Sequence, residues 1–439
     1  MTTVAKAGPR TISMASADSA KELEVWLADP FCFTPWYSAA LTNALRDAGA
    51  VVRLLAASVS REPKYFAQQG ITTDPGPMRF DQMADGWHPR LRKPIRAAAA
   101  TMNAAFVMRS LNRRKRTRPD VLHLQQLPAL NHGMGIDFAL IAKAQQCGVP
   151  VVHTVHNLLP HDSGSSLRSV YQRLYSVVDH LICHSTDVAE ALHRDFNIPL
   201  DLLSVVPHGP LFEEIGQASQ HKAQARRHLG IPASRSVVLW QGVMAPYKGL
   251  DVLIDAWNVC MSRWDVGTSR PLLLIAGTGS AAEESLVGAA AKLHSDSIRA
   301  DLRYIATTEL PFYYQAADLL VYPYRDITTS GALLTGLSYC KPILASDLPP
   351  FREYLSQEEN AILMPPGDSS SLARTLESLL QDIVKLSGAH DTSAQSSVQQ
   401  PGDLYTKLLV GASMNRQRYT GWNVIANETL AIYRSLVLS

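Results

Sequence analysis

Short apolar runs alternate with amphipathic helical patterns along nearly the whole chain. Val51–Ala56, Val121–Leu124 and Leu319–Tyr322 are examples of the runs, and Leu250–Met261 is typical of the helical patterns between them. A run that is apolar throughout indicates a strand buried on both faces, and a helix between two such strands allows them to pair in parallel. The pattern therefore predicts an α/β fold with doubly wound parallel sheets.

The same reasoning places the other elements. We expect further strands at Leu23–Ala28, Val151–Thr154, His180–Cys183, Leu203–Val206, Ser236–Gln241, Pro271–Ala276, Leu302–Ile305 and Pro342–Ala345. We expect further helices at Ser38–Ala48, Phe138–Gln146, Asp187–Asp195, Leu310–Ala316, Gly331–Cys340, Ser371–Ile383 and Gln417–Leu436. The order fits two Rossmann-like halves that meet near Pro207–Phe212, and 439 residues are enough for two or three domains.

This organisation predicts four parts. Residues 1–20 form a tail, 21–207 a first Rossmann-like domain, 208–415 a second one, and 416–439 a C-terminal helix. Residues 384–404 are rich in Ser, Gln and Gly and are expected to form a surface insertion. The sequence leaves open whether the C-terminal helix packs back on the first domain.

Composition narrows the class of protein. An apolar content of 46% and a charged content of 18% are typical of a globular chain rather than a disordered one. The five cysteines include no C-x-x-C pair, which argues against a disulfide framework or zinc site and favours a reducing compartment. No apolar run is long enough to span a bilayer, and the N-terminus lacks the apolar core of a signal peptide. We therefore expect a cytoplasmic protein.

Positive charge is concentrated in residues 89–118. This segment holds ten of the 41 Lys and Arg residues and no acidic residue, which leaves 31 basic against 39 acidic residues elsewhere. Nucleic-acid binding is disfavoured because the segment lacks interleaved aromatics and any known module. A solvated face is one alternative. We favour an anionic membrane surface, with Ala97–Met108 partly inserted and the flanking cations on lipid headgroups.

Two features suit a phosphate ligand. The turn Thr328–Gly331 stands between the run Leu319–Tyr322 and a helical pattern. A helix N-terminus presents unpaired backbone N–H groups and the positive end of the helix dipole. Lys248, in a PYKG turn that follows another apolar run, can supply a cation to the same phosphate.

These features occur within segments that together resemble the family 4 glycosyltransferases of GT-B fold. VVLWQGVMAPYKGLDVLIDAW (Val237–Trp257) is similar to the opening of that family's second domain, and LLLIAGTGS and ADLLVYPY follow in the expected order. KPILASDLPPFREYL and NAILMPPGD complete the resemblance, which covers roughly residues 120–435. It implies two Rossmann-like domains that face a central cleft.

The chain departs from the family at the E-x7-E signature of its retaining members. The two signature positions are Ile327 and Thr335, and Val243 stands where an arginine is usual. SGALLTGLSYCKP and the segment VVHTVHNLLPHD (151–162) instead resemble the inverting β-mannosyltransferases of xanthan-type exopolysaccharide synthesis. We therefore favour inversion and keep a retaining α-glycosyltransferase as the alternative.

The resemblance implies the following site residues, each with an ordinary structural alternative. Donor-binding residues would be His208, Gly242, Lys248, Tyr324, Arg325, Thr328, Thr329, Ser330, Gly331 and Ala332. Acceptor-binding residues would be Thr34, Trp36, Tyr37 and Asn157. Arg325 equally suits a surface salt bridge, Ser330 an ordinary helix cap, and the aromatic residues core packing.

Inversion requires a general base on the acceptor side. Asp162 is the preferred candidate, and His161 and His156 are its rivals, because all three follow the strand at 151–154. Asp162 precedes Ser163-Gly164, so its alternative role is to cap a helix or close a turn.

Together these observations predict a metal-independent hexosyltransferase of surface-glycan assembly. It would move a hexose from GDP-mannose or a UDP-sugar to a hydroxyl of a lipid-linked glycan, at the inner face of the cytoplasmic membrane. The sequence contains no D-x-D motif and no cluster with metal-ligand spacing, and no cofactor is expected. A sugar-nucleotide epimerase and a degenerate nucleotide-sugar-binding scaffold subunit remain alternatives.

Overall fold

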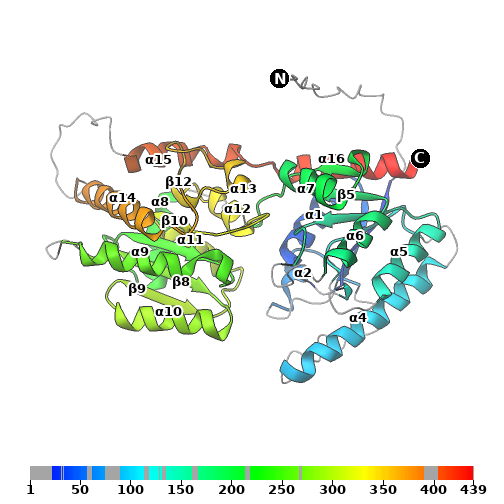
Figure 1. Cartoon of the computed structure of the whole chain (residues 1–439), viewed down its shortest axis with the longest axis horizontal. Coiled ribbons are helices and arrows are strands. Elements are labelled where there is room, and N and C mark those ends of the chain that lie inside the picture. Colours follow the sequence, from blue (N-terminus) through cyan, green and yellow to red (C-terminus); the bar gives the residue numbers. More distant parts are fainter. Residues whose placement is uncertain are drawn as a thin grey trace, which may run out of the picture.

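The computed structural model describes residues 22–30, 32, 34–56, 62–74, 89–112, 118–127, 129–130, 135–160, 167–212, 218–265, 269–389 and 404–438. Within these residues the chain forms two lobes, each built around a six-stranded sheet whose paired strands are all parallel (Figure 1). The predicted α/β class with two doubly wound parallel sheets is confirmed.

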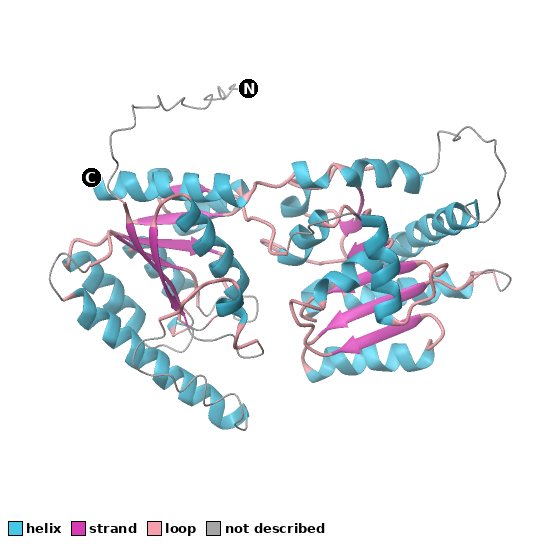
Figure 2. Cartoon of the chain, turned by 180° about the vertical axis from the view of Figure 1, so that it is seen from behind, coloured by secondary structure: helices cyan, strands magenta, loops and turns pink. Residues whose placement is uncertain are grey.

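The first sheet has the strand order β2-β1-β3-β4-β5-β6. Its strands are β1 (Glu24–Asp29), β2 (Val51–Ala56), β3 (Val121–Leu124), β4 (Val151–Val155), β5 (His180–Cys183) and β6 (Leu203–Val205). Its helices are α1 (Pro35–Asp47), α2 (Tyr65–Gln68), α4 (Pro89–Leu111), α5 (Ile136–Gln146), α6 (Arg168–Val177) and α7 (Thr186–Phe196), with a 3-10 turn η4 (Leu200–Leu202). The helices lie on both faces of the sheet, so its central strands are fully buried (Figures 1 and 2).

The second sheet has the strand order β12-β11-β10-β7-β8-β9. Its strands are β7 (Val237–Gln241), β8 (Leu272–Gly277), β9 (Ile298–Leu302), β10 (Leu319–Tyr322), β11 (Ile343–Ser346) and β12 (Ala361–Met364). Its helices are α8 (Ala218–Leu229), α9 (Leu250–Ser262), α10 (Ala281–Leu293), α11 (Leu310–Ala316), α12 (Gly331–Ser338), α13 (Pro349–Arg352), α14 (Ser369–Ala389) and α15 (Leu404–Ser413). A 3-10 turn, η5 (Pro246–Lys248), precedes α9.

The end of the chain returns to the first lobe. After α15 and a 3-10 turn, η6 (Asn415–Gln417), helix α16 (Trp422–Leu438) packs against α1. Ile425, Leu430 and Tyr433 of α16 lie in the same apolar cluster as the strands of the first sheet. Figures 1 and 2 both show this segment passing from one lobe to the other along one side of the molecule.

The strand predicted at Leu302–Ile305 is wrong, because β9 lies earlier, at Ile298–Leu302. β9 is an edge strand that pairs only with β8, and most of its residues are partly exposed. An edge strand tolerates charged side chains such as Arg299 and Asp301, so its sequence lacks the apolar run that identified the central strands.

One buried carboxylate connects three elements of the second lobe. Asp318, 4% exposed, precedes β10 and accepts a hydrogen bond of 2.7 Å from the backbone N–H of Val237 at the start of β7. Its side chain also pairs with Arg226 of α8 at 2.7 Å and with Lys222. A buried carboxylate is stable only with such partners, so its ion pairs hold α8 against the sheet.

We expect Asp318→Asn to lower the free energy of unfolding by about 3 kcal/mol, because it leaves the buried guanidinium of Arg226 without its counter-charge. Asp296→Asn, which removes an exposed ion pair with Arg270, should cost less than about 1 kcal/mol. Urea denaturation of the two variants measures both values. Equal losses would contradict the role assigned to Asp318.

Candidate active site

A cleft of about 760 Å³ lies between the two lobes. Its first wall comes from segments that follow strands of the first sheet, including Asn157 after β4 and His208 after β6. Its second wall comes from the segment after β7, including Tyr247, and from Thr329 and Gly331 at the start of α12. Parallel sheets place such segments at their carboxyl edges, and the volume is in the range that binds a small molecule.

The PYKG turn brings Tyr247 to this cleft, and Lys248 follows it directly in the chain. Gly249 has φ +64°, and a Cβ at this position would lie 2.0 Å from the carbonyl oxygen of Pro323. Only glycine fits such a conformation and such a close approach. The turn therefore ends abruptly at Gly249, directly after Lys248 and directly before α9.

Lys248 is a cation without a counter-charge among the residues that the structure describes. Its Nζ lies 5.9 Å from the ring centre of Tyr247 and 5.6 Å from that of Tyr324, and no ion pair to it is found there. Gly242 leaves room for the ammonium, since a Cβ at Gly242 would be 3.0 Å from Nζ. Burial lowers the pKa of Lys248 to about 8. An anion in the cleft would supply the missing charge.

Ser330 caps α12, whose first residue, Gly331, lines the cleft together with Tyr247. Its Oγ accepts a hydrogen bond of 3.2 Å from the backbone N–H of Leu333, which caps the helix. Gly331 follows, and a Cβ there would lie 2.9 Å from a methyl carbon of Leu211, so the helix start abuts the segment that joins the lobes. The N-terminus of α12 therefore borders the cleft, where its dipole favours an anion.

Thr328 joins the two walls of the cleft. Its hydroxyl lies 2.7 Å from Oδ1 of Asn157 and 3.2 Å from the carbonyl oxygen of His156. The turn that precedes α12 is therefore hydrogen-bonded directly to the loop that follows β4. An expected donor residue and an expected acceptor residue are thus in contact.

Other expected donor residues have structural partners. Arg325 pairs with Asp251 through two contacts of 2.6 and 2.8 Å and donates to the carbonyl oxygen of Pro246 at 2.9 Å, so it holds the PYKG turn in place. The side chain of Tyr324 is fully buried and packs against Phe351. The carbonyl oxygen of Ala332 accepts from the hydroxyl of Tyr322.

The two positions of the retaining signature are buried and do not line the cleft. Ile327 and Thr335 are 7% and 2% exposed. The hydroxyl of Thr335 donates to the carbonyl oxygen of Gly331 within α12. Neither position lines the cleft.

The acceptor residues expected at the start of α1 lie on the first wall. The hydroxyl of Thr34 donates to Asp29 at 3.3 Å. Trp36 packs edge-on against Phe212 at 6.0 Å, and its buried Nε1 has no hydrogen-bond partner. Tyr37 is 3% exposed and packs against His156 and His208, each at 4.9 Å.

Buried histidines accompany Tyr37 beneath the cleft. Burial lowers the pKa of His156 well below its usual value, that of His184 to about 4 and that of His208 to about 3. His156, one of the three base candidates, lies 2.8 Å from Gln125 and 3.3 Å from His184 through its two ring nitrogens. His161 and Asp162 lie outside the described residues.

Sequence reasoning overlooked Gln125, His184 and Thr154. The only signal was positional, since each lies at or just after the end of an expected strand. Thr154 hydrogen-bonds His123 at 2.7 Å, and His184 contacts Tyr37 at 5.2 Å.

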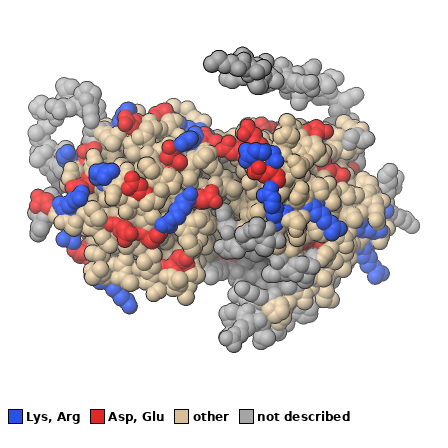
Figure 3. All heavy atoms as spheres, viewed as in Figure 1, with Lys and Arg blue, Asp and Glu red and all other residues tan. Residues whose placement is uncertain are grey.

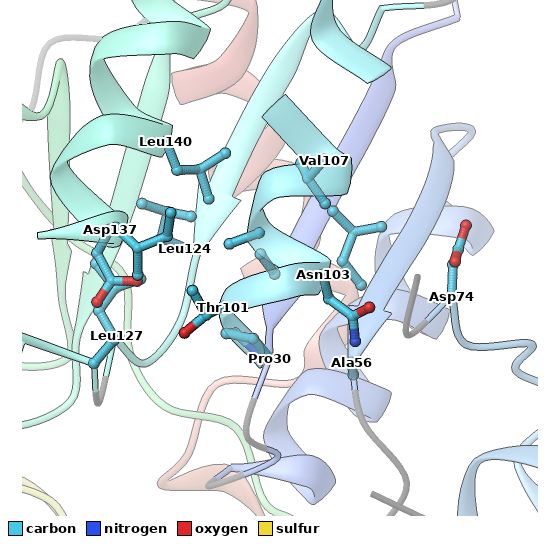
Figure 4. A pocket seen from close by; sticks show the side chains of 15 residues that line it. Pro30, Ala56, Asp74, Thr101, Asn103, Val107, Leu124, Leu127, Asp137 and Leu140 are labelled. Carbon is cyan, nitrogen blue, oxygen red and sulfur yellow. The ribbon is translucent and has the colours of Figure 1, made fainter. Parts of the chain in front are cut away.

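A second pocket, with about 50 Å³ of internal space, lies between α4 and the first sheet. Figure 4 shows Thr101, Asn103 and Val107 on one side and Leu127 and Asp137 on the other. The lining is mainly apolar, and burial raises the pKa of Asp137 to about 7. The pocket is too small for a nucleotide sugar, which leaves the cleft between the lobes as the candidate active site.

Among the described residues, no group of three or more His, Cys, Asp or Glu side chains is arranged to hold a metal ion. None of the helices in the described ranges combines the length and apolar character needed to cross a membrane.

Comparisons with known proteins agree with this architecture. A model of the family described as "Glycosyltransferase Family 4" matches residues 36–210, and one described as "Glycosyl transferases group 1" matches residues 235–382. The first match covers most of the first lobe and the second match covers the wall that carries Lys248 and Ser330.

Curated relatives include two enzymes with different substrates. The chain is 27% identical over 304 residues to a D-inositol 3-phosphate glycosyltransferase of Thermobispora bispora, with 66% of each chain covered. It is 27% identical over 207 residues to a GDP-mannose:glycolipid 4-beta-D-mannosyltransferase of Xanthomonas campestris, covering 47% of this chain and 52% of that one. The chain thus spans between about half and two thirds of the length of these relatives.

Solved structures share the fold. Anabaena HepE in complex with UDP and glucose superposes with a TM-score of 0.64 at 16% identity, covering 94% of this chain and 100% of that one. A sucrose-phosphate synthase of Thermosynechococcus elongatus superposes with a TM-score of 0.67 at 18% identity, covering 94% and 99%. The fold is therefore GT-B.

The pKa of Lys248 predicts how anion binding depends on pH. The ammonium is charged below about pH 8 and neutral above it, so the affinity for inorganic pyrophosphate should fall as the pH rises through 8. Titration calorimetry between pH 6.5 and 9.5 measures this. Lys248→Arg should remove the decline, because a guanidinium stays charged over the whole range. A wild-type affinity that is constant across pH 8 would contradict the assignment.

Proposed function

The chain belongs to the family 4, group 1 glycosyltransferases, and we propose that it transfers a hexose from a nucleotide-diphosphate sugar to a hydroxyl of a lipid-linked glycan. The observation that carries the proposal is that Tyr247, the neighbour of Lys248, and Gly331 at the N-terminus of α12 line the same cleft, while Lys248 has no counter-charge among the described residues. Both features favour a diphosphate.

Lys248 and the Thr328–Gly331 turn would act on the leaving group. As the bond between the anomeric carbon and the diphosphate oxygen breaks, its electron pair stays on the diphosphate. A half-buried cation and a helix N-terminus stabilise that growing charge without first having to reorganise. Residues Trp36 and Asn157 on the opposite wall would face the acceptor.

We favour an inverting reaction with Asp162 as the base. The acceptor oxygen would attack the anomeric carbon from the side opposite the diphosphate while its proton passes to the carboxylate. Two observations support this. The retaining signature is replaced by Ile327 and Thr335, both buried and neither of them lining the cleft, and one relative is a β-mannosyltransferase. Retention is the alternative, and the anomeric configuration of the product distinguishes the two.

The donor is proposed to be GDP-mannose or a UDP-sugar. The Xanthomonas relative is named for GDP-mannose and a glycolipid, and the structure of Anabaena HepE contains UDP and glucose. The cleft is large enough for either nucleotide sugar. The glycolipid acceptor of that relative supports surface-glycan or exopolysaccharide assembly as the pathway.

A lipid-linked acceptor requires the enzyme to work at a membrane surface. Residues 89–118 hold ten basic and no acidic residues, and α4 spans most of that segment. On the face shown in Figure 3, basic and acidic side chains are interspersed over the described parts of both lobes. We propose that the α4 segment binds the anionic inner face of the cytoplasmic membrane.

Transfer is tested with a panel of UDP- and GDP-sugars and a membrane extract containing lipid-linked oligosaccharides. One donor should be consumed, with or without EDTA. Lys248→Ala should lower kcat/KM by about 10²-fold or more, because the leaving group loses its cation. Lys292→Ala, which removes an exposed lysine of α10, should have no effect.

Asp162→Asn should abolish transfer but leave nucleotide-sugar binding intact. Turnover of the donor without acceptor would favour the epimerase instead. Binding of a nucleotide sugar without transfer to any acceptor would favour the degenerate scaffold subunit.

Membrane binding is tested by flotation with phosphatidylglycerol vesicles. Replacing Arg90, Arg92, Lys93 and Arg96 together with Gln should weaken binding by about 10³-fold, since each cation contributes roughly 1 kcal/mol near an anionic surface. The matched control replaces four cations of the second lobe: Arg263, Arg270, Lys385 and Lys407. If both variants bind equally well, the α4 segment is not the contact.

A further inference from the structure

A chain of hydrogen bonds lies beneath the cleft and connects the carboxyl ends of four neighbouring strands, β3 to β6. Every side chain in it is at least nine-tenths buried. In order, its members are the carbonyl of Val206, His184, His156, Gln125, His123 and Tyr433 of α16. The donors and acceptors along such a chain must alternate, so one end determines the rest.

The Val206 end sets the direction. His184 Nδ1 lies 3.1 Å from the Val206 carbonyl oxygen, which only accepts, so the proton of His184 is on Nδ1. Burial lowers the pKa of His184 to about 4 and keeps His156 neutral as well. The Nε2 of a neutral His184 is then an acceptor. His156 Nδ1, 3.3 Å away, must therefore be the donor.

Gln125 is the next member. Since His156 carries its proton on Nδ1, its Nε2 needs a donor, and the amide of Gln125 lies 2.8 Å away. The amide nitrogen therefore faces His156 and the amide oxygen faces His123, at 3.2 Å. This assignment exchanges the two amide atoms relative to the structure, where the amide oxygen faces His156 and the amide nitrogen faces His123. That orientation needs a second proton on His184, which the burial of this ring opposes.

The other end completes the pattern. His123 Nε2–H donates to Gln125 and to Thr154, which lies 2.7 Å away, and His123 Nδ1 accepts from the Tyr433 hydroxyl at 2.5 Å. His123 is also neutral, because burial lowers its pKa to about 3. Every donor and acceptor in this chain of hydrogen bonds therefore has a partner, and none of its side chains carries a charge.

Among the described residues, the groups packed around this chain of hydrogen bonds supply no fixed counter-charge for a protonated histidine ring. Tyr37 and His208 contact His184 at 5.2 and 5.0 Å. Glu353 of the second lobe lines a small pocket with His184, and burial, followed by the charge of Asp187, raises the pKa of Glu353 to about 7. The neutral arrangement is therefore the resting one.

We propose that Gln125, His184 and Tyr433 are positioning residues that hold His156 as the Nδ1–H tautomer and so fix the His156–Asn157 loop that binds Thr328. Both ring nitrogens of His156 then take part in hydrogen bonds within the chain. The contact of His156 with Thr328 of the second lobe is made by its backbone carbonyl and not by its ring. His156 is thereby excluded as the general base. The kinetic part of this inference rests on the proposed function, whereas the tautomer does not.

The tautomers are tested first, by ¹⁵N NMR of the histidine rings in the full-length protein at pH 7. His156 and His184 should show protonated Nδ1, and His123 should show protonated Nε2. Gln125→Glu should keep the chain but convert His156 to an imidazolium, because both carboxylate oxygens accept. A wild-type His156 protonated on Nε2 overturns the proposal.

Kinetics test the positioning role. Gln125→Leu should raise the donor KM about tenfold, the effect of one lost buried hydrogen bond, with a smaller change in kcat. Gln125→Glu should restore KM to within about threefold of wild type, since it preserves the contacts. A loss confined to kcat, or no rescue by glutamate, overturns the proposal.

Tyr433→Phe should raise KM about threefold by removing one hydroxyl at the end of the chain. Tyr405→Phe is the control, because it removes a similarly buried hydroxyl that donates to the Asp318 carbonyl in the second lobe. It should leave KM unchanged. Equal effects of both variants would reduce the role of Tyr433 to general stability and overturn the proposal.

If wild type binds no nucleotide sugar, the proposed function fails, and the NMR result still decides the tautomer.

Discussion

Parallel pairing is the constraint on which the rest of this structure depends. When every strand of a sheet points the same way, the segments that leave those strands gather at one edge. Gln125, His156 and His184 meet there in the first lobe although they are far apart in sequence. In the second lobe Gly249 after β7 and Pro323 after β10 approach each other there, and Thr328 bonds across to the first lobe. The cleft is where these two edges approach each other.

Sequence reasoning succeeded where the signal is local. Central strands such as Val121–Leu124 are apolar throughout because both faces are buried, and Lys248 and Ser330 stand in short turns with their own glycine or cap. It failed at β9, an exposed edge with no apolar run. It also missed the partnership of Gln125 with His184 and Tyr433. Such contacts join residues that are distant along the chain, and no spacing within one segment encodes them.

The second lobe contains one buried charge that is fully paired, on Asp318, and one for which the described residues offer no counter-charge, on Lys248. Asp318 is buried with two cations and a backbone N–H, so its charge is fully matched. Within the described part of the chain Lys248 faces two tyrosine rings and no acidic partner, and burial lowers its pKa. Folding alone would favour a partner for this ammonium. A buried ammonium without a counter-charge among the described residues costs stability, and such a cost is expected where a residue serves function.

The return of α16 to the first lobe has a consequence for biosynthesis. Ile425, Leu430 and Tyr433 belong to the core around β1 and α1, yet they are made after the whole second lobe. During translation the first lobe therefore leaves the ribosome with part of its apolar surface uncovered, and domains usually fold in the order in which they emerge. Here the first lobe is complete only after α16 has been made. A prematurely terminated product would carry an intact second lobe beside an unfinished first one, which marks it for chaperone binding or degradation.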